Sequence, residues 1–323
     1  MIRTALIGAA FAAAPFASAA RDIPLAFPVA CTPGETCFVQ NYVDRDPTGG
    51  VADLLCGPLS YDGHEGTDIA LPTLAAMERG VDVLAAAPGI VRGTRDALPD
   101  VSFRDEAAPD LAGRDCGNGV LVDHGGGWST QYCHLRRGSV AVRSGQRIRA
   151  GHVLGQVGLS GLTEFPHLHF TVREGDAPVD PFDRTGVATC DDGDLHPLWR
   201  DPVPYDPAGA MAAGLSSTMP SWDAIRAGGV DPAPSAAGEL HLWAAFHGGR
   251  AGDEVAMAIT GPNGTIHEST LMLDRDQAQF FRSSGLRPPE GGWPPGRYEG
   301  RAALIRDGQT IETQATSTLL RRR

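Results

Sequence analysis

Pro166-His167-Leu168-His169-Phe170 is the segment of this 323-residue chain that best predicts its fold. Side chains alternate between the two faces of a β-strand, so the two histidines would share one face, and Leu168 and Phe170 the other. The Cα atoms of the histidines would lie about 6.5 Å apart, which suits one shared centre. The pattern predicts a strand with one face in the core and one at a site, although two surface histidines would also fit it.

Short apolar runs bounded by glycine extend this pattern in both directions. Residues 119–122 (GVLV) and 153–157 (VLGQV) are two of them, and residues 124–128 (HGGGW) are typical of a hairpin turn. Little of the sequence has the 3.6-residue period of a helix. We therefore expect a mainly β protein.

Two further clusters place histidines next to useful partners: residues 64–68 (HEGTD) and residues 132–135 (YCHL). On a straight strand His64 and Asp68 would lie about 13 Å apart, but Gly66 allows the chain to bend and bring them closer. A helical H-E-x-x-H zinc motif with Glu65 as base is a competing interpretation. It is disfavoured because aspartate replaces the second histidine, and because glycine and a nearby proline are poor in helices.

Two histidines and one aspartate around one zinc ion would leave a fourth position open, which is typical of catalytic rather than structural zinc. Zinc lowers the pKa of a water bound at that position to about 7, and the metal can polarise a peptide carbonyl. Imidazoles beside such a centre can move protons and stabilise an oxyanion. The pattern therefore predicts one Zn²⁺ per chain and hydrolytic chemistry.

These segments, in this order, resemble the lysostaphin/LytM family of zinc endopeptidases, which shows H-x-x-x-D, then Y-x-H-L, then P-H-L-H-F. Residues 119–125 and 179–182 are also similar to that family, and the resemblance covers roughly residues 60–183. It implies a mostly antiparallel β fold with a narrow groove floored by the sheet. It also implies cleavage of peptidoglycan stem peptides or cross-bridges.

The resemblance assigns roles to five residues. It implies that His64, Asp68 and His169 bind zinc and that His134 and His167 are the catalytic pair. Two alternatives stay open: a non-catalytic regulator of other cell-wall hydrolases, and an exported zinc peptidase that acts on proteins. Some relatives carry an inhibitory segment ahead of the peptidase domain, and no residue marks one here.

Composition divides the chain into five parts, which we expect to differ in structure. They are a signal peptide at 1–20, an irregular lead-in at 21–59, the zinc metallopeptidase domain at 60–185, a Pro/Gly/Ala-rich linker at 186–237 and an Ig-like β-sandwich module at 238–323. Asn263-Gly264 and Asp307-Gly308 are hairpin signals in the last part. Every candidate site residue precedes the linker, so a protein ending near Pro204 is expected to fold, bind zinc and cleave a small soluble peptide at close to the rate of the full chain.

Charge and composition exclude several functions. The formal net charge of −12 argues against binding to nucleic acid or anionic membranes. The signal peptide predicts an exported protein, periplasmic or secreted, and no later stretch is long and apolar enough to span a membrane. We also expect a monomer. The chain has no lysine, which excludes a biotinyl or lipoyl carrier domain.

Six cysteines in an exported chain predict disulfides. Cys116 and Cys133 flank the predicted hairpin near facing positions, so we expect them to pair. Six cysteines allow 15 connectivities, and the pairing of the other four stays open, with Cys31–Cys37 and Cys56–Cys190 favoured. A cysteine-protease dyad of Cys133 with His134 is disfavoured because adjacent strand residues face opposite ways.

Overall fold

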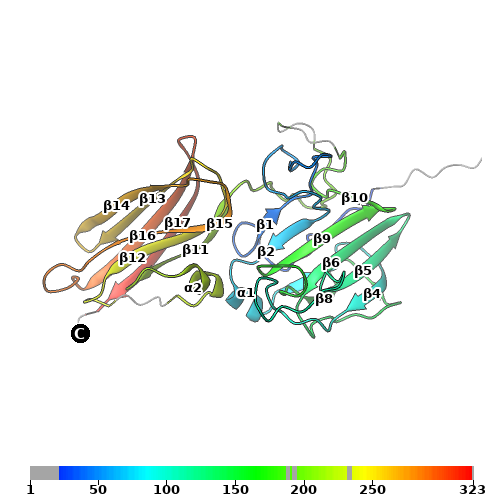
Figure 1. The fold of residues 1–323 in the computed structure, drawn as a ribbon, viewed down its shortest axis with the longest axis horizontal. Helices are drawn as coiled ribbons and strands as arrows, with labels where there is room; N and C mark the ends of the chain where they lie inside the picture. Colours follow the sequence, from blue (N-terminus) through cyan, green and yellow to red (C-terminus); the bar gives the residue numbers. More distant parts are fainter. Residues whose placement is uncertain (1–21, 187–189, 191–194, 231–234, 322–323) are drawn as a thin grey trace, which may run out of the picture.

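A computed structural model describes residues 22–186, 190, 195–230 and 235–321. The predicted signal peptide lies outside these residues. Within the described part, no helix is long and apolar enough to cross a membrane. The chain is mainly antiparallel β, as predicted, and its sheets form two groups that lie next to each other (Figure 1).

Eight of the described strands form the first sheet. Its spatial order is β1 (Phe38–Asn41), β2 (Thr67–Ala70), β9 (His167–Glu174), β6 (Trp128–Leu135), β5 (Asn118–Gly125), β4 (Gly89–Arg95) and β7 (Arg147–Ile148), with β10 (Ala177–Val179) paired to β9. A short pair of strands, β3 (Asp82–Leu84) and β8 (Val153–Gln156), and helix α1 (Leu74–Glu78) lie outside it.

Strand β9 has the alternation expected from its sequence. Leu168 and Phe170 are fully buried in the core, where Ile69 and Tyr132 of the neighbouring strands join them. The opposite face of β9 carries both histidines. Burying one large apolar side chain contributes roughly 1.5–3 kcal/mol, so these residues hold the central strands in register.

The lead-in at residues 21–59 is part of this first unit. We had expected only an irregular segment there. Leu25, Tyr42 and Leu54 are almost completely buried in the same core as the sheet. Strand β1 comes from the lead-in and pairs antiparallel with β2. The physical reason is that its apolar residues have no core of their own and close the edge of the sheet instead.

A buried ion cluster attaches the lead-in to the end of the peptidase part. Arg45 lies 2.8 Å from a carboxylate oxygen of Asp180 and 2.9 Å from one of Asp183, and all three side chains are at most 2% exposed. Burial raises the pKa of Asp180 even though Arg45 opposes the shift. The guanidinium therefore supplies positive charge that offsets the cost of burying these carboxylates.

Arg45→Met should destabilise the fold by about 3–5 kcal/mol, because it leaves two carboxylates buried without their cation. Denaturant unfolding followed by fluorescence measures the change. Arg92→Met is the matched control, since Arg92 pairs with Asp123 at an exposed position, where such pairs contribute about 0–1 kcal/mol. Equal losses for the two variants would contradict this role for the buried cluster.

The second group of strands forms a two-layered unit. One layer has the order β11 (Gly209–Ser216), β12 (Leu240–Gly249) and β15 (Gln277–Leu286), and the other has β14 (Gly264–Met272), β13 (Glu254–Gly261), β16 (Gly296–Arg306) and β17 (Gln309–Leu320). Side chains of both layers, among them Leu242, Phe246 and Val255, share one core.

The two hairpins predicted in this unit are present with one adjustment. Asp307 and Gly308 both have positive φ, 51° and 75°, as a tight two-residue turn requires. In the other hairpin Gly261 pairs with Gly264. Its loop residues are therefore Pro262 and Asn263, one position earlier than expected.

The stretch at 186–237 is not a linker throughout, and here the expectation was wrong. Strand β11 and helix α2 (Trp222–Ala227) lie within it, and β11 pairs with β12 along its length. Its small residues look like linker composition but serve close packing. A Cβ on Gly214 would come within 2.5 Å of the Trp243 ring, so only glycine fits beneath that indole.

Candidate metal centre

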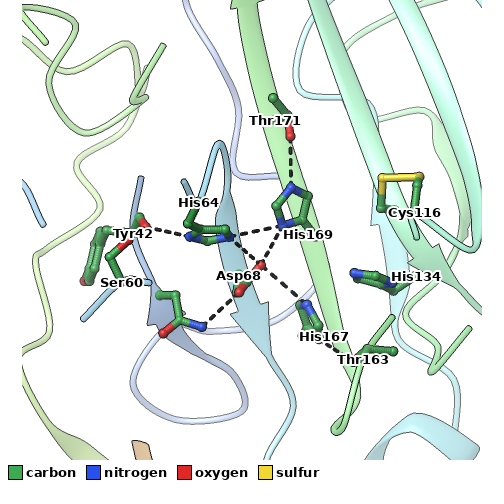
Figure 2. A network of polar contacts seen from close by, with 12 residues as sticks. Tyr42, Ser60, His64, Asp68, Cys116, His134, Thr163, His167, His169 and Thr171 are labelled. Atoms are coloured by element: carbon green, nitrogen blue, oxygen red, sulfur yellow. Dashed lines mark hydrogen bonds and ion pairs between the residues drawn. A yellow bond between two sulfur atoms is a disulfide. The ribbon is translucent and has the colours of Figure 1, made fainter. Parts of the chain in front are cut away.

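Strand pairing brings together candidate ligands that lie about a hundred residues apart in the sequence. Asp68 of β2 lies directly opposite His169 of β9, so both side chains emerge on the same face of the sheet. His64 reaches the same point from the turn before β2 (Figure 2). Gly66 allows this approach, because a Cβ there would lie 2.6 Å from Nε2 of His169.

Three potential ligand atoms form a small triangle. His64 Nε2 lies 3.2 Å from both Asp68 Oδ1 and His169 Nδ1, and His169 Nδ1 lies 2.8 Å from Asp68 Oδ1. Ligand atoms about 2.0–2.2 Å from a tetrahedral zinc ion would be separated by roughly 3.3 Å. The triangle is therefore close to the size that a zinc ion requires.

In each of the two imidazoles, the nitrogen that points away from the centre has its own hydrogen-bond partner. That partner indicates that the other nitrogen faces the centre with a lone pair. His64 Nδ1 lies 2.7 Å from the backbone carbonyl oxygen of Tyr42, so it carries the proton and leaves Nε2 unprotonated in the neutral ring. His169 Nε2 lies 3.1 Å from Oγ1 of Thr171, which can accept a hydrogen bond from the Nε2–H group and leave Nδ1 unprotonated. Two nitrogen lone pairs and one carboxylate oxygen then point at one place, an arrangement that suits a cation.

The charges of the buried side chains agree with a cation at this place. Burial opposes ionisation of Asp68, but the neighbouring His64 and His167 rings hold its pKa well below the usual value. Burial also lowers the pKa of His64, yet the Asp68 carboxylate outweighs this effect and raises it. A proton can therefore occupy the centre, and a divalent metal ion can replace it. Nitrogen and carboxylate ligands together suit zinc.

Residues outside the predicted set orient the candidate ligands. Asn41 donates a hydrogen bond from Nδ2 to Asp68 Oδ2 at 2.9 Å, which leaves Oδ1 for the centre. Such outer contacts fix ligand geometry. Thr171 could have been found from the sequence, because it lies two positions after His169 on the same strand face. Asn41 and the Tyr42 carbonyl could not, because they arrive through the long-range pairing of β1 with β2.

His167 lies beside the triangle. Its Nε2 is 3.4 Å from Asp68 Oδ1, while Nδ1 lies 3.0 Å from the carbonyl oxygen of Phe165 and 3.1 Å from Oγ1 of Thr163. Nδ1 therefore carries the proton and donates it in a hydrogen bond to the backbone carbonyl, and Nε2 faces the centre.

His134 comes to the same side through an unusual backbone conformation. Its φ is 61°, in the left-handed region, so the alternation of faces that was expected between Cys133 and His134 is broken here. The ring centroid lies 4.6 Å from that of His167, and Nδ1 lies 2.8 Å from the carbonyl oxygen of Ser160. Burial, with the charges of His167 and His169, lowers the pKa of His134 well below its ordinary value.

The disulfides agree with the predicted pairing. Cys116–Cys133, Cys31–Cys37 and Cys56–Cys190 are all present. Cys133 is opposite His169 in the β6–β9 ladder, and its bridge to Cys116 lies beside His134 (Figure 2). The disulfide removes Cys133 from consideration as a nucleophile.

A pocket of about 420 Å³ opens next to the triangle. It is lined by Tyr61, Glu65, Asp115, Cys116, Gln131, Cys133, His134, Leu162, His169, Thr171 and Arg173. His64 and Asp68 are each only 2% exposed, so His169 and His134 are the members of the set that face this space. Strands β9 and β6 form its floor, as expected for a groove above the sheet.

Comparison with known proteins matches this part of the chain to one family. Residues 62–181 match the model of Peptidase family M23. The predicted family resemblance is therefore confirmed for these residues, and they form an M23 domain.

Several curated relatives align with the same part. The chain is 32% identical over 124 residues to the cell division protein DipM of Caulobacter vibrioides, covering 36% of this chain and 17% of DipM. It is 31% identical over 118 residues to the DD-carboxypeptidase/endopeptidase Mpg of Neisseria meningitidis and 29% over 117 residues to the peptidoglycan DD-endopeptidase ShyA of Vibrio cholerae. Each of these two alignments covers 36% of this chain and 22% of the relative. The chain thus matches about a fifth of its relatives' length.

Solved structures with a related fold include a zinc-containing peptidase from Vibrio cholerae, with 24% identity over 44% of this chain and 38% of that chain and a TM-score of 0.29. Another is the catalytic domain of lysostaphin from Staphylococcus simulans, with 20% identity over 44% of this chain and 85% of that chain and a TM-score of 0.28.

Proposed function

We propose that this chain, whose residues 62–181 form an M23 peptidase domain, is a zinc-dependent endopeptidase that hydrolyses peptide cross-links of bacterial peptidoglycan. The observation that carries the proposal is the convergence of His64 Nε2, Asp68 Oδ1 and His169 Nδ1 within 4.8 Å of one another. These three atoms would hold one Zn²⁺. Zinc bound there would supply Lewis acidity, which polarises a peptide carbonyl and makes water a nucleophile near neutral pH.

His134 and His167 would manage the protons of this hydrolysis. Both rings donate from Nδ1 to a backbone carbonyl, so both present Nε2 to the reaction side. His134 has a lowered pKa and is neutral at pH 7, so it can accept a proton from the attacking water and return it to the leaving amine. His167 is in reach of the same space and can donate a hydrogen bond to a developing oxyanion.

The substrate class is inferred from the relatives. Mpg and ShyA are named as enzymes that act as DD-endopeptidases, ShyA on peptidoglycan. Three disulfides suit an oxidising compartment outside the cytoplasm, where peptidoglycan lies. A non-catalytic regulator is the alternative that the intact set of five residues argues against, because a regulator has no need to keep ligands and proton carriers together.

Digestion of purified peptidoglycan tests this function. The zinc-loaded full chain should release fragments with new amino and carboxyl termini within the peptide cross-links, as identified by mass spectrometry. A denatured protein substrate, incubated in parallel, should be cut far more slowly. Cleavage of the protein with peptidoglycan left intact would favour the general peptidase, and cleavage of neither would favour the regulator.

A further inference from the structure

The loop between β8 and β9 carries the anchors of both proton-handling histidines. The Ser160 carbonyl accepts the hydrogen bond of His134, and the Phe165 carbonyl and Thr163 hydroxyl contact Nδ1 of His167. The direction of each imidazole therefore depends on the position of this loop, which we define as residues 157–166.

The first half of the loop is fixed by the peptidase sheet. Ser160 is fully buried and donates from Oγ to the Leu135 carbonyl at 2.7 Å, while the amide of Asn118 donates to Ser160 Oγ at 2.9 Å. Gly161 and Gly117 pack so closely that a Cβ on either would meet backbone atoms at 2.3 and 2.1 Å. This half cannot move without disturbing the core.

The second half of the loop has a partner from outside the peptidase part. Arg226 of α2 donates from Nη2 to the backbone carbonyl of Glu164. Because the peptide bond from Glu164 to Phe165 is planar, fixing the Glu164 carbonyl restricts the backbone that aims the Phe165 carbonyl at His167. The Glu164 side chain takes no part in this contact and pairs with Arg104 at an exposed position.

Helix α2 is held firmly by the C-terminal unit. Ile225 is 2% exposed in a cluster with Trp243 and Ala245, and Trp222 stacks on Phe281 of β15 with centroids 5.8 Å apart. Gly228 caps the C-terminus of the helix, and a Cβ on it would lie 2.9 Å from Cβ of Ala75, so α2 also packs directly against α1 (Figure 1).

Further contacts keep the C-terminal unit in this position. The ring of Phe38 on β1 stacks on His247 of β12 with centroids 4.2 Å apart and an interplanar angle of 10°. Gln40 donates to the Ala278 carbonyl at 3.0 Å and accepts from Gln279 at 2.8 Å. These contacts lie on the strand next to β2, so the unit is attached at two separate places.

We propose that Arg226 is a positioning residue for the hydrolysis and that, through it, the C-terminal unit holds the loop that aims His167. The inference rests on the function proposed above. If Arg226 has this role, the C-terminal unit contributes to the turnover of small substrates, independently of any contribution to binding the cell wall.

Arg226→Ala should lower kcat for a small soluble cross-linked peptide by about tenfold, because small displacements of a catalytic group can cost up to roughly 100-fold. The zinc content should stay unchanged, since the contacts that hold His64, Asp68 and His169 do not involve Arg226. KM should also stay unchanged, since Arg226 does not line the pocket. Arg226→Lys should recover part of the loss, because an ammonium group can also donate to the Glu164 carbonyl. A parallel fall of kcat and zinc content would contradict the inference.

Two matched arginine-to-alanine controls separate this effect from a general loss of surface charge. Arg104→Ala removes the exposed pair with the Glu164 side chain and leaves the carbonyl contact intact. Arg287→Ala changes a side chain of the C-terminal unit that is 90% exposed. Both should retain the wild-type kcat. A loss equal to that of Arg226→Ala in either control would overturn the role of Arg226.

Hydrogen exchange gives a readout that does not depend on activity. In Arg226→Ala the amides of Phe103 and Leu71, which donate to the carbonyls of Thr163 and Pro166, should exchange faster than in the wild type. The Asn118 amide, which bonds to Ser160, should keep its protection. Unchanged exchange throughout would overturn the inference, whereas an inactive wild-type protein with faster exchange in the variant would disprove only the proposed function.

Discussion

His169→Ala is expected to lose zinc and activity together, whereas His167→Ala, only two residues earlier on the same strand face, is expected to keep its zinc. The reason is the direction of the two rings. His169 Nδ1 lies 2.8 Å from Asp68 Oδ1 and completes the triangle, while His167 Nε2 lies 3.4 Å from that oxygen and is not one of the three converging atoms. Removing one of three ligands leaves too few to hold the metal.

The same loss is expected for His64→Ala and Asp68→Ala. Elemental analysis of the purified variants gives zinc per chain, and hydrolysis of a cross-linked peptide gives the rate. Circular dichroism should show that the three ligand variants remain folded, since the hydrophobic core of the peptidase sheet consists of apolar side chains and does not depend on the metal. A His167 variant that lost zinc while His169→Ala retained it would exchange the two roles.

His134→Ala and His167→Ala are expected to retain one zinc per chain and to lose turnover by about 10²–10⁴-fold, the range of general acid–base catalysis. Both side chains are buried beside the triangle, with Nε2 facing it, and neither ring is needed to complete the ligand set. His152→Ala is a suitable control, because His152 is exposed and its ring contacts Gln146 rather than a residue of the site. Wild-type turnover in either site variant would remove that residue from the proton path.

The parts of the site that are local in sequence were predictable. The alternation in β9 gave the shared face of His167 and His169, and Gly66 indicated the bend that brings His64 to Asp68. Both features depend only on backbone geometry over a few residues. The position of His134 was reached only through the family resemblance, because its left-handed backbone breaks the alternation that the sequence suggests.

The parts that depend on distant pairing were not predictable. Asn41 and the Tyr42 carbonyl reach the site because the lead-in closes the edge of the sheet, which no local pattern announces. The glycine- and alanine-rich strand β11 has only two large apolar residues, Met211 and Leu215, which are too few to mark a strand. Its pairing with β12 is a long-range contact in which Gly214 lies opposite Trp243.

These contacts also change the expectation for a protein ending near Pro204. Tyr205 donates to a carboxylate oxygen of Asp53 at 2.8 Å, and the amide of Asp206 donates to the Tyr42 hydroxyl at 2.9 Å. Truncation would remove both bonds together with Arg226. We therefore now expect the shortened protein to turn over small peptides more slowly than the full chain.

One zinc ion at His64, Asp68 and His169 is proposed to enable peptide-bond hydrolysis. The most direct test titrates zinc into chelator-treated full-length protein while zinc per chain and cleavage of a cross-linked stem peptide are measured on the same samples. Cleavage should be absent without metal, rise in proportion to bound zinc and saturate at one zinc per chain. Cleavage that persists in the zinc-free protein, or no cleavage at full occupancy, would contradict this role of the zinc ion.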